Sequence, residues 1–181
     1  MRRRPAEPLP LSADRLRFVL STSDENLPLE SDHFDMVYSN GAMCHIEEKE
    51  GILKECYRVL SPNGTLVIND WLSPTKGEWR GHVNRLIELD GLSLFAETVE
   101  GYLKRLTGAQ FTGVAAQDVT DQYADLNEAI VDCLKAPLKR EELIGTFGEP
   151  LYFDAVETYD VTAKAMRAGD LLVYQFTASK K

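Results

Sequence analysis

The sequence predicts an α/β fold in which helices flank a sheet that is parallel at least in part. Its 181 residues, 44% hydrophobic and 27% charged, suit one globular domain with a core of its own. A strand–helix–strand pattern fills residues 34–69, and the apolar run LLVYQFTA at residues 171–178 predicts a strong final strand. Internal repeats, low-complexity tracts and a second-domain linker are missing from the sequence.

The N-terminal part of the chain leads into the first strand of that pattern. Residues 1–14 carry three prolines and no periodicity, which predicts an irregular arm before a single domain at 15–181. RLRFVL at 15–20 predicts a short strand, and a polar loop follows at 21–33. The run MVY within residues 34–39 predicts a strand covered on both faces, as in a parallel sheet.

A helix and a second strand complete the pattern. Apolar residues recur on one helical face between residues 47 and 60, and two glutamates stand in the first turn, near the positive end of the dipole. SPNG at residues 61–64 predicts the turn that ends the helix, and TLVIN at 65–69 predicts a second buried strand.

The rest of the chain predicts four helical segments and two strands. The helical segments are expected at residues 79–89, 98–106, 121–147 with an interruption near Pro137, and 151–167, and the strands at 111–119 and 171–178.

Composition excludes several classes of protein. The net charge of −9 argues against a nucleic-acid partner, which would require a basic face. An apolar run long enough to span a bilayer and a signal-peptide core are both missing from the sequence, so we expect no membrane partner. Cys44, Cys56 and Cys133 are far apart and the histidines are scattered, so we expect no metal site and reduced thiols in a cytoplasmic protein.

Several short motifs occur in a fixed order along residues 34–71. They are Phe34-Asp35, Ser39, His45, Arg58-Val59-Leu60, Pro62-Asn63-Gly64 and Asp70-Trp71. This ordered set resembles the class I S-adenosylmethionine-dependent methyltransferases. The resemblance implies a partial Rossmann-like methyltransferase sheet, made of family strands 3 to 7 with flanking helices, over residues 15–181. Asn63 replaces a family glycine, and asparagine tolerates the left-handed conformation that this turn needs.

Residues 97–181 look most like the phosphoethanolamine methyltransferase branch and its small-molecule N-methyltransferase relatives. The family binds S-adenosylmethionine mainly through a Gly-rich loop after its first strand. The twelve glycines of this chain never fall in that pattern. The main cofactor-binding loop is therefore absent from these 181 residues.

The resemblance marks cofactor-side positions in what remains. Ser39 ends the family's fourth strand and Asn40 follows it, where the main chain contacts the methionine end of the cofactor; a simple turn residue is the alternative for Asn40. Asp24 lies one residue from the position of the adenine-binding Asp, so adenine binding and a solvated loop residue are both open interpretations.

The resemblance also marks catalytic and substrate-side positions. His45 matches a catalytic histidine and could take the acceptor's proton; a helix-entry histidine with local hydrogen bonds is the alternative. Gly41 replaces an Asp of the branch, Trp71 stands where the branch often has Tyr, and Arg167 lies near a phosphate-contacting Lys. Residues 90–95 (DGLSLF) lack the branch's phosphate-binding Arg and Tyr. These differences favour an acceptor less charged than phosphoethanolamine.

Two hypotheses about function follow. The chain is a truncated or split S-adenosylmethionine-dependent methyltransferase that acts on a small-molecule amine or hydroxyl, or it is a non-catalytic methyltransferase-like module that binds a partner chain or small ligand. Without family strands 1 and 2, the strand at 34–39 becomes an exposed edge. We expect residues 15–20 to pair with it, a second copy to form a homo-oligomer across it, or a chain that supplies the missing half to dock there.

Overall fold

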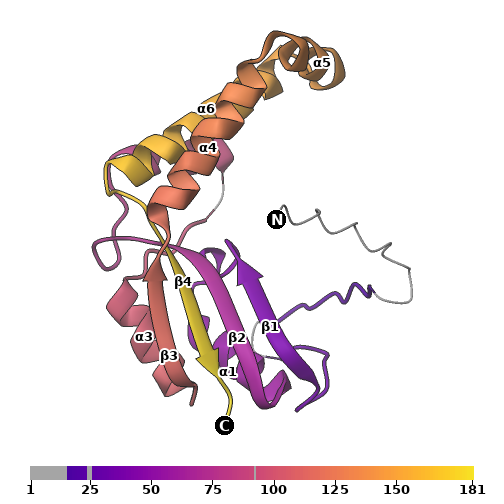
Figure 1. The fold of residues 1–181 in the computed structure, drawn as a ribbon, viewed down its shortest axis with the longest axis vertical. Coiled ribbons are helices and arrows are strands. Elements are labelled where there is room, and N and C mark those ends of the chain that lie inside the picture. Colours follow the sequence, from indigo (N-terminus) through magenta and orange to yellow (C-terminus); the bar gives the residue numbers. More distant parts are fainter. Residues whose placement is uncertain (1–15, 24–25, 92) are drawn as a thin grey trace, which may run out of the picture.

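The computed structural model describes residues 16–23, 26–91 and 93–181. Figure 1 shows a sheet with helices behind it and a helical arm that projects from one end. The strands are β1 (Phe34–Asn40), β2 (Leu60–Leu72), β3 (Thr112–Asp118) and β4 (Leu172–Ser179). The helices are η2 (Met43–His45, 3-10), α1 (Lys49–Val59), α2 (His82–Asp90), α3 (Val99–Gly108), α4 (Thr120–Lys135), α5 (Pro137–Phe147) and α6 (Glu149–Arg167).

The strand order is β1-β2-β4-β3. β1 and β2 are parallel, with Tyr38 opposite Val67, whereas β4 runs antiparallel to both of its neighbours. The predicted α/β class and the parallel pairing of the first two strands are confirmed. The resemblance implies the family sheet order 3-2-1-4-5-7-6, and the observed order agrees with its part 4-5-7-6.

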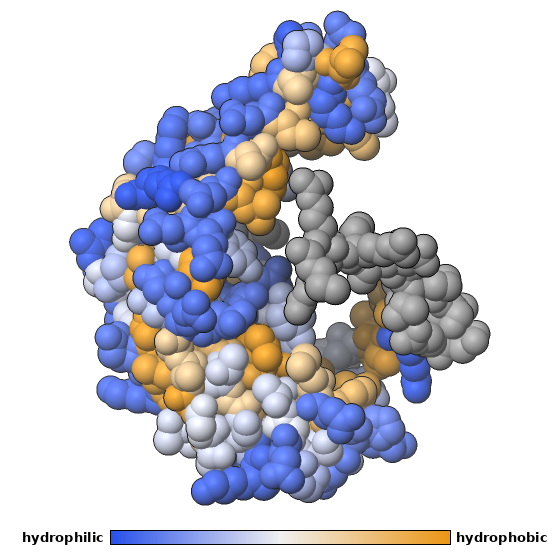
Figure 2. All heavy atoms as spheres, in the orientation of Figure 1, coloured by the Kyte–Doolittle hydropathy of each residue, from blue (hydrophilic) through white to orange (hydrophobic). Residues whose placement is uncertain are grey.

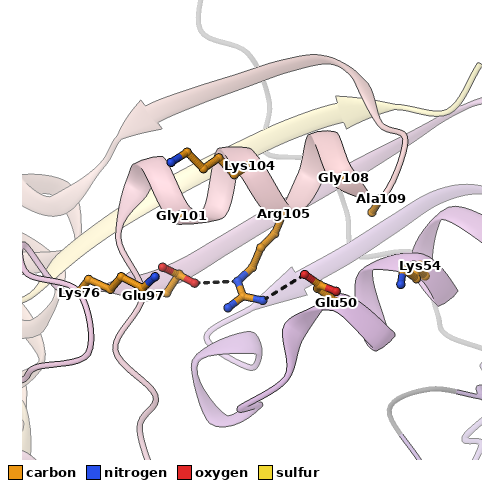
Figure 3. A pocket seen from close by; sticks show the side chains of 9 residues that line it. All are labelled: Glu50, Lys54, Lys76, Glu97, Gly101, Lys104, Arg105, Gly108 and Ala109. Carbon is orange, nitrogen blue, oxygen red and sulfur yellow. Dashed lines mark hydrogen bonds and ion pairs between the residues drawn. The ribbon is translucent and has the colours of Figure 1, made fainter.

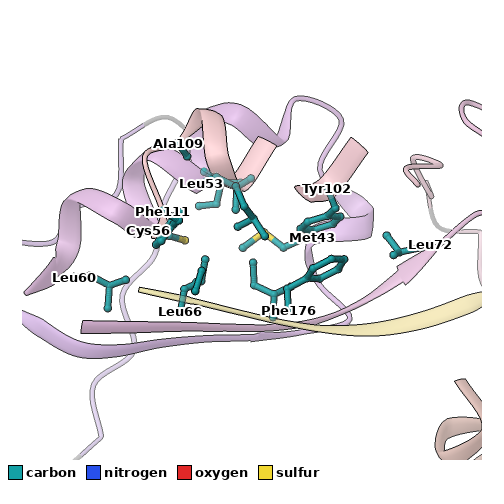
Figure 4. Packing of buried hydrophobic residues seen from close by; sticks show 14 residues of the cluster. Met43, Leu53, Cys56, Leu60, Leu66, Leu72, Tyr102, Ala109, Phe111 and Phe176 are labelled. Carbon is teal, nitrogen blue, oxygen red and sulfur yellow. The ribbon is translucent and has the colours of Figure 1, made fainter. Parts of the chain in front are cut away.

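The main core lies between one face of the sheet and helices α1 and α3 (Figure 4). In β2, Leu66 and Ile68 face these helices and are almost fully buried. Tyr102 of α3 stacks on Phe176 of β4, with ring centroids 4.5 Å apart and 11° between the planes. Alternate residues of each strand serve this face, which leaves the other face of the sheet to the residues between them.

The arm consists of α4 and α6 side by side, with α5 at its tip (Figure 1). Its base packs on α2 and on the start of β4 through a second cluster of buried residues. These are Val83, Leu86, Val119, Ala124, Val161, Ala165, Met166, Leu171 and Val173. The arm therefore stands over the end of the sheet where β1 and β2 finish.

Two predictions about the N-terminal part were wrong. Residues 16–20 form no strand; they are extended and open to solvent, with Phe18 90% exposed. β1 is not covered on both faces, because Met36 and Tyr38 are each 59% exposed. In the described part of the chain β1 pairs with β2 alone, so it is the predicted edge strand, and residues 16–20 do not pair with it. Pairing with a second copy or another chain stays a prediction.

The predicted turn at residues 61–64 lies inside the bounds of β2 as an irregularity. The register with β1 shifts here, from Leu60 opposite Phe34 to Thr65 opposite Met36. Asn63 takes a positive φ of 66°, which confirms that it adopts the left-handed conformation in place of glycine.

Candidate active site

The carboxyl end of β1 is a tight turn held against β2. Gly41 has a φ of 61°, and its amide donates to the backbone oxygen of Asn69 over 2.9 Å. A Cβ on Gly41 would meet nothing within 4 Å, so the space beside this backbone is open. Ser39 is half-buried within β1 opposite Ile68, and Asn40 is exposed at its end. An open backbone at the carboxyl end of a parallel strand is where α/β sheets place ligands.

A buried carboxylate fixes the 3-10 turn that follows. Asp70, at the end of β2, accepts hydrogen bonds from the Cys44 amide at 3.0 Å and from the Tyr102 hydroxyl at 3.1 Å. Burial raises the pKa of Asp70, although these bonds and the nearby Lys49 act in the opposite direction. Lys49 in turn donates to the Ile46 carbonyl at 2.8 Å. The core of the domain therefore sets the position of the turn.

His45 ends this turn with its ring exposed. Its Nδ1 lies 2.8 Å from the Ser93 carbonyl oxygen. A carbonyl can only accept, so Nδ1 carries the proton in the neutral ring and Nε2 keeps its lone pair. This tautomer can act as a base through Nε2. The local hydrogen bond and the catalytic interpretation are therefore compatible, and the catalytic role stays a prediction.

A cleft of about 210 Å³ lies between the sheet end and the arm. Asn40, Gly41 and Trp71 line it from the sheet, and Tyr123 lines it from α4. The Tyr123 hydroxyl donates to Asn40 Oδ1 over 2.9 Å, which ties the arm to the end of β1. Partial burial, together with the nearby Tyr38 hydroxyl, raises the pKa of Tyr123. In the space-filling view apolar side chains gather on the concave side of the arm, toward the sheet (Figure 2).

Three of the predicted site residues, Asn40, Gly41 and Trp71, thus line one cleft, whereas Ser39, His45 and Arg167 are outside its lining. Asp24 lies outside the described residues. Arg167 contributes to a separate groove, where Asp121, Asp125 and Glu128 surround its guanidinium. That placement does not favour a substrate contact, and the role of Arg167 stays a prediction.

Three residues of the arm that line the cleft, Tyr123, Asn127 and Tyr159, were not predicted from the sequence. Tyr123, Asn127 and Ile130 follow one another at helical spacing on one face of α4, and this periodicity was the available signal. Tyr159 has no comparable local signal.

A second pocket, of about 330 Å³, lies between α1 and α3 and is lined largely by charged residues (Figure 3). Arg105 donates to Glu97 over 2.7 Å and lies 3.9 Å from Glu50. Burial acts to raise the pKa of Glu97, but hydrogen bonds from Arg105 and the Thr98 amide outweigh it and lower that pKa. The positive charge of Arg105 is therefore balanced by carboxylates of the same chain. The remaining cations, Lys54, Lys76 and Lys104, are exposed.

Residues 16–23, 26–91 and 93–181 contain no group of three or more His, Cys, Asp or Glu side chains that could hold a metal ion. None of the helices in the same part of the chain is long and apolar enough to cross a membrane.

The sequence matches a family model described as a methyltransferase domain over residues 3–68. It is 31% identical over 119 residues to a phosphoethanolamine N-methyltransferase of Plasmodium falciparum, covering 65% of this chain and 43% of that protein. It is 28% identical over 150 residues to phosphoethanolamine N-methyltransferase 1 of Zea mays, covering 82% of this chain and 29% of that protein. The chain therefore spans less than half the length of these curated relatives.

The fold has solved counterparts. Phosphoethanolamine N-methyltransferase 2 of Haemonchus contortus, solved with phosphomonomethylethanolamine and S-adenosylhomocysteine, superposes with a TM-score of 0.75. The match covers 87% of this chain and 36% of that one at 16% sequence identity. At that identity the match shows a shared fold.

Proposed function

We propose that this chain forms the acceptor side of a methyltransferase for a small-molecule amine or hydroxyl. The chain belongs to the class I S-adenosylmethionine-dependent methyltransferases, near the phosphoethanolamine N-methyltransferase branch. The observation that carries this proposal is the cleft beneath the arm. Its sheet side includes Asn40, Gly41 and Trp71, which lie at the carboxyl ends of two parallel strands. Ligands of open α/β sheets bind at such ends.

The residues present fit one end of S-adenosylmethionine. The open backbone at Gly41 and the neighbouring Ser39 and Asn40 would meet the methionine end. The Gly-rich loop that would meet the rest is absent from these 181 residues. When bound, the cofactor supplies an electrophilic methyl group. His45 would accept, at Nε2, the proton that the acceptor nitrogen or oxygen loses, and Asp70 holds the turn that carries His45.

Calorimetric titration of the purified chain with S-adenosylhomocysteine tests the cofactor side. Micromolar binding that weakens in Gly41→Val would support it, since a β-branched side chain at a φ of 61° is strained and would fill the open space. The absence of binding up to millimolar concentration would contradict a cofactor site in the chain alone.

The proposed base is tested by kinetics once methyl transfer is measurable. His45→Gln should lower kcat by roughly 100- to 10,000-fold, the range for a lost general base, and leave cofactor affinity unchanged. His33→Gln is the matched control, because His33 is an exposed histidine beside β1, in contact with Glu30. Equal activity of both variants would exclude His45 as the base.

The alternative function, a non-catalytic module that binds a partner chain or a small ligand, is favoured by the exposed edge and face of β1. Met36 and Tyr38 are each 59% exposed, on a strand that pairs with β2 alone among the residues that the structure describes. Exposed strand edges add further strands. We infer a homo-oligomer, or a complex with a chain that carries the cofactor half, formed at this edge in the cytoplasm.

Sedimentation velocity distinguishes the partners. A dimer that dissociates in Tyr38→Lys would support self-association at β1, because a charge on an edge strand opposes pairing. A wild-type chain that stays monomeric at every concentration tested would leave the partner chain as the surviving form of the proposal.

A further inference from the structure

Two hollows adjoin beneath the arm and form one extended site. The cleft at the sheet end measures about 210 Å³, and a wider groove along α6 measures about 580 Å³. Trp71, Asn127 and Tyr159 line both hollows. A molecule held at the end of β1 can therefore extend along the arm.

The side chains of this site are suited to a cation. Three aromatic rings come from three elements: Trp71 from β2, Tyr123 from α4 and Tyr159 from α6. The faces of such rings attract ammonium groups, and tryptophan does so most strongly. Asp154 is exposed and lines the same groove as Tyr159 and Trp71. The lining of the site therefore contains both aromatic rings and a carboxylate.

The same lining is unsuited to a phosphate group. Among the described residues around the two hollows there is no Lys, Arg or His. Arg167 of α6 lines a different groove and is already paired with three carboxylates. Recognition of a phosphomonoester relies on such cations, mainly on bidentate arginine.

We infer that the site beneath the arm binds a small molecule through a positively charged ammonium head, held by Trp71 and Tyr159 where the two hollows meet, with Asp154 on the groove side and Tyr123 on the cleft side, and that it does not select a phosphomonoester. This inference rests on the proposed function for the identity of the site as the acceptor site. An alkylamine arrives protonated at neutral pH, and its methylated product is again a cation. The same rings and carboxylate would hold both.

The test uses the full chain without cofactor and a probe of the head alone. Tetramethylammonium chloride is titrated and followed by Trp fluorescence, with tert-butanol as the neutral probe of similar shape, inorganic phosphate as the anion and sodium chloride as the ionic-strength control. Tetramethylammonium should bind roughly tenfold more tightly than tert-butanol, the ratio expected for a partly desolvated cation–π site. Equal binding of the two, or tighter binding of phosphate, would overturn the inference.

Variants locate the binding. Tyr159→Phe keeps a ring face and should bind as the wild type does, whereas Tyr159→Leu should bind several-fold more weakly. Asp154→Asn should also weaken tetramethylammonium binding and leave tert-butanol binding unchanged. Asp160→Asn is the matched control, because Asp160 lies on α6 too but pairs with Lys164 in another groove. If Asp160→Asn and Asp154→Asn weakened binding equally, the effect would be general charge and the inference would fail.

The titrations distinguish a failure of the proposed ammonium site from a failure of the proposed function. A chain that binds S-adenosylhomocysteine but does not distinguish tetramethylammonium from tert-butanol refutes the ammonium site alone. A chain that binds tetramethylammonium but not S-adenosylhomocysteine refutes the cofactor site of the lone chain and leaves the ammonium site supported.

Discussion

Replacing Tyr102 by Phe removes one oxygen atom from the centre of the domain. The Tyr102 side chain is fully buried, and its hydroxyl donates to Asp70 Oδ2 over 3.1 Å. The ring itself stacks on Phe176, and phenylalanine preserves that contact. The substitution therefore tests the hydrogen bond and not the packing.

The size of the effect follows from the partners that Asp70 keeps. A hydrogen bond to a charged acceptor is worth about 1.5–3 kcal/mol. Asp70 retains the bond from the Cys44 amide and the attraction of Lys49, so we expect a loss near the middle of that range, about 2 kcal/mol at pH 7. In a chain of this length this corresponds to a fall in Tm of about 4–8 °C.

The pH dependence has a definite sign. Burial raises the pKa of Asp70 in the folded protein, so the ionised carboxylate lowers stability as the pH rises from its unfolded pKa through its folded pKa. Without the Tyr102 hydroxyl the folded pKa rises further. The deficit of Tyr102→Phe should therefore be complete at neutral pH and shrink as the pH falls toward 4 (about the unfolded pKa of Asp).

Urea denaturation at pH 7 and at lower pH measures the deficit. Tyr152→Phe is the matched control: Tyr152 is also buried, but its hydroxyl donates to a neutral acceptor, the Leu134 carbonyl, at 3.2 Å. Tyr152→Phe should lower the free energy of unfolding by about 1 kcal/mol, and this loss should not depend on pH over the range studied. A Tyr102→Phe variant within about 0.5 kcal/mol of the wild type at pH 7, or a deficit that grows in acid, would refute the reasoning, since that is the spread of neutral surface changes.

Two further predictions concern the other side of the core. Glu55→Gln should destabilise the chain by about 1–2 kcal/mol in urea denaturation at neutral pH. The reason is that hydrogen bonds from Arg58 and from the Leu27 amide hold the pKa of Glu55 in the folded chain below its ordinary value. The deficit should disappear as the pH falls through that folded pKa, whereas Glu50→Gln, whose side chain is 62% exposed, should cost little at any pH. Treatment of the folded chain with iodoacetamide, followed by mass spectrometry, should show rapid modification of the exposed Cys133 alone. Burial raises the pKa of the Cys44 and Cys56 thiols to about 12, so they should react slowly. Equal labelling of all three cysteines would contradict the burial of Cys44 and Cys56.

The regular elements with a strong local signal could be predicted from the sequence. The apolar face of residues 47–60 and the run at 171–178 predicted α1 and β4 within two residues at each end. The prediction of a strand at residues 15–20 was wrong, although RLRFVL has the composition of a strand. A strand forms only when a partner backbone supplies its hydrogen bonds, and the described part of the chain brings none to residues 16–20.

The sequence by itself determined the strand–helix–strand core and the left-handed conformation of Asn63. It also determined that Gly41, His45 and Trp71 lie near the carboxyl ends of two parallel strands. Each of these features depends on residues that are close together in the chain. The tertiary structure alone decided what covers that end of the sheet. The Tyr123 hydroxyl bonds to Asn40 across 83 positions of sequence, and Tyr159 lines the same cleft as Trp71 because α6 packs against α4. Helical spacing marks one face of α4, but it does not tell which part of the sheet that face covers, because that depends on packing between residues far apart in the chain.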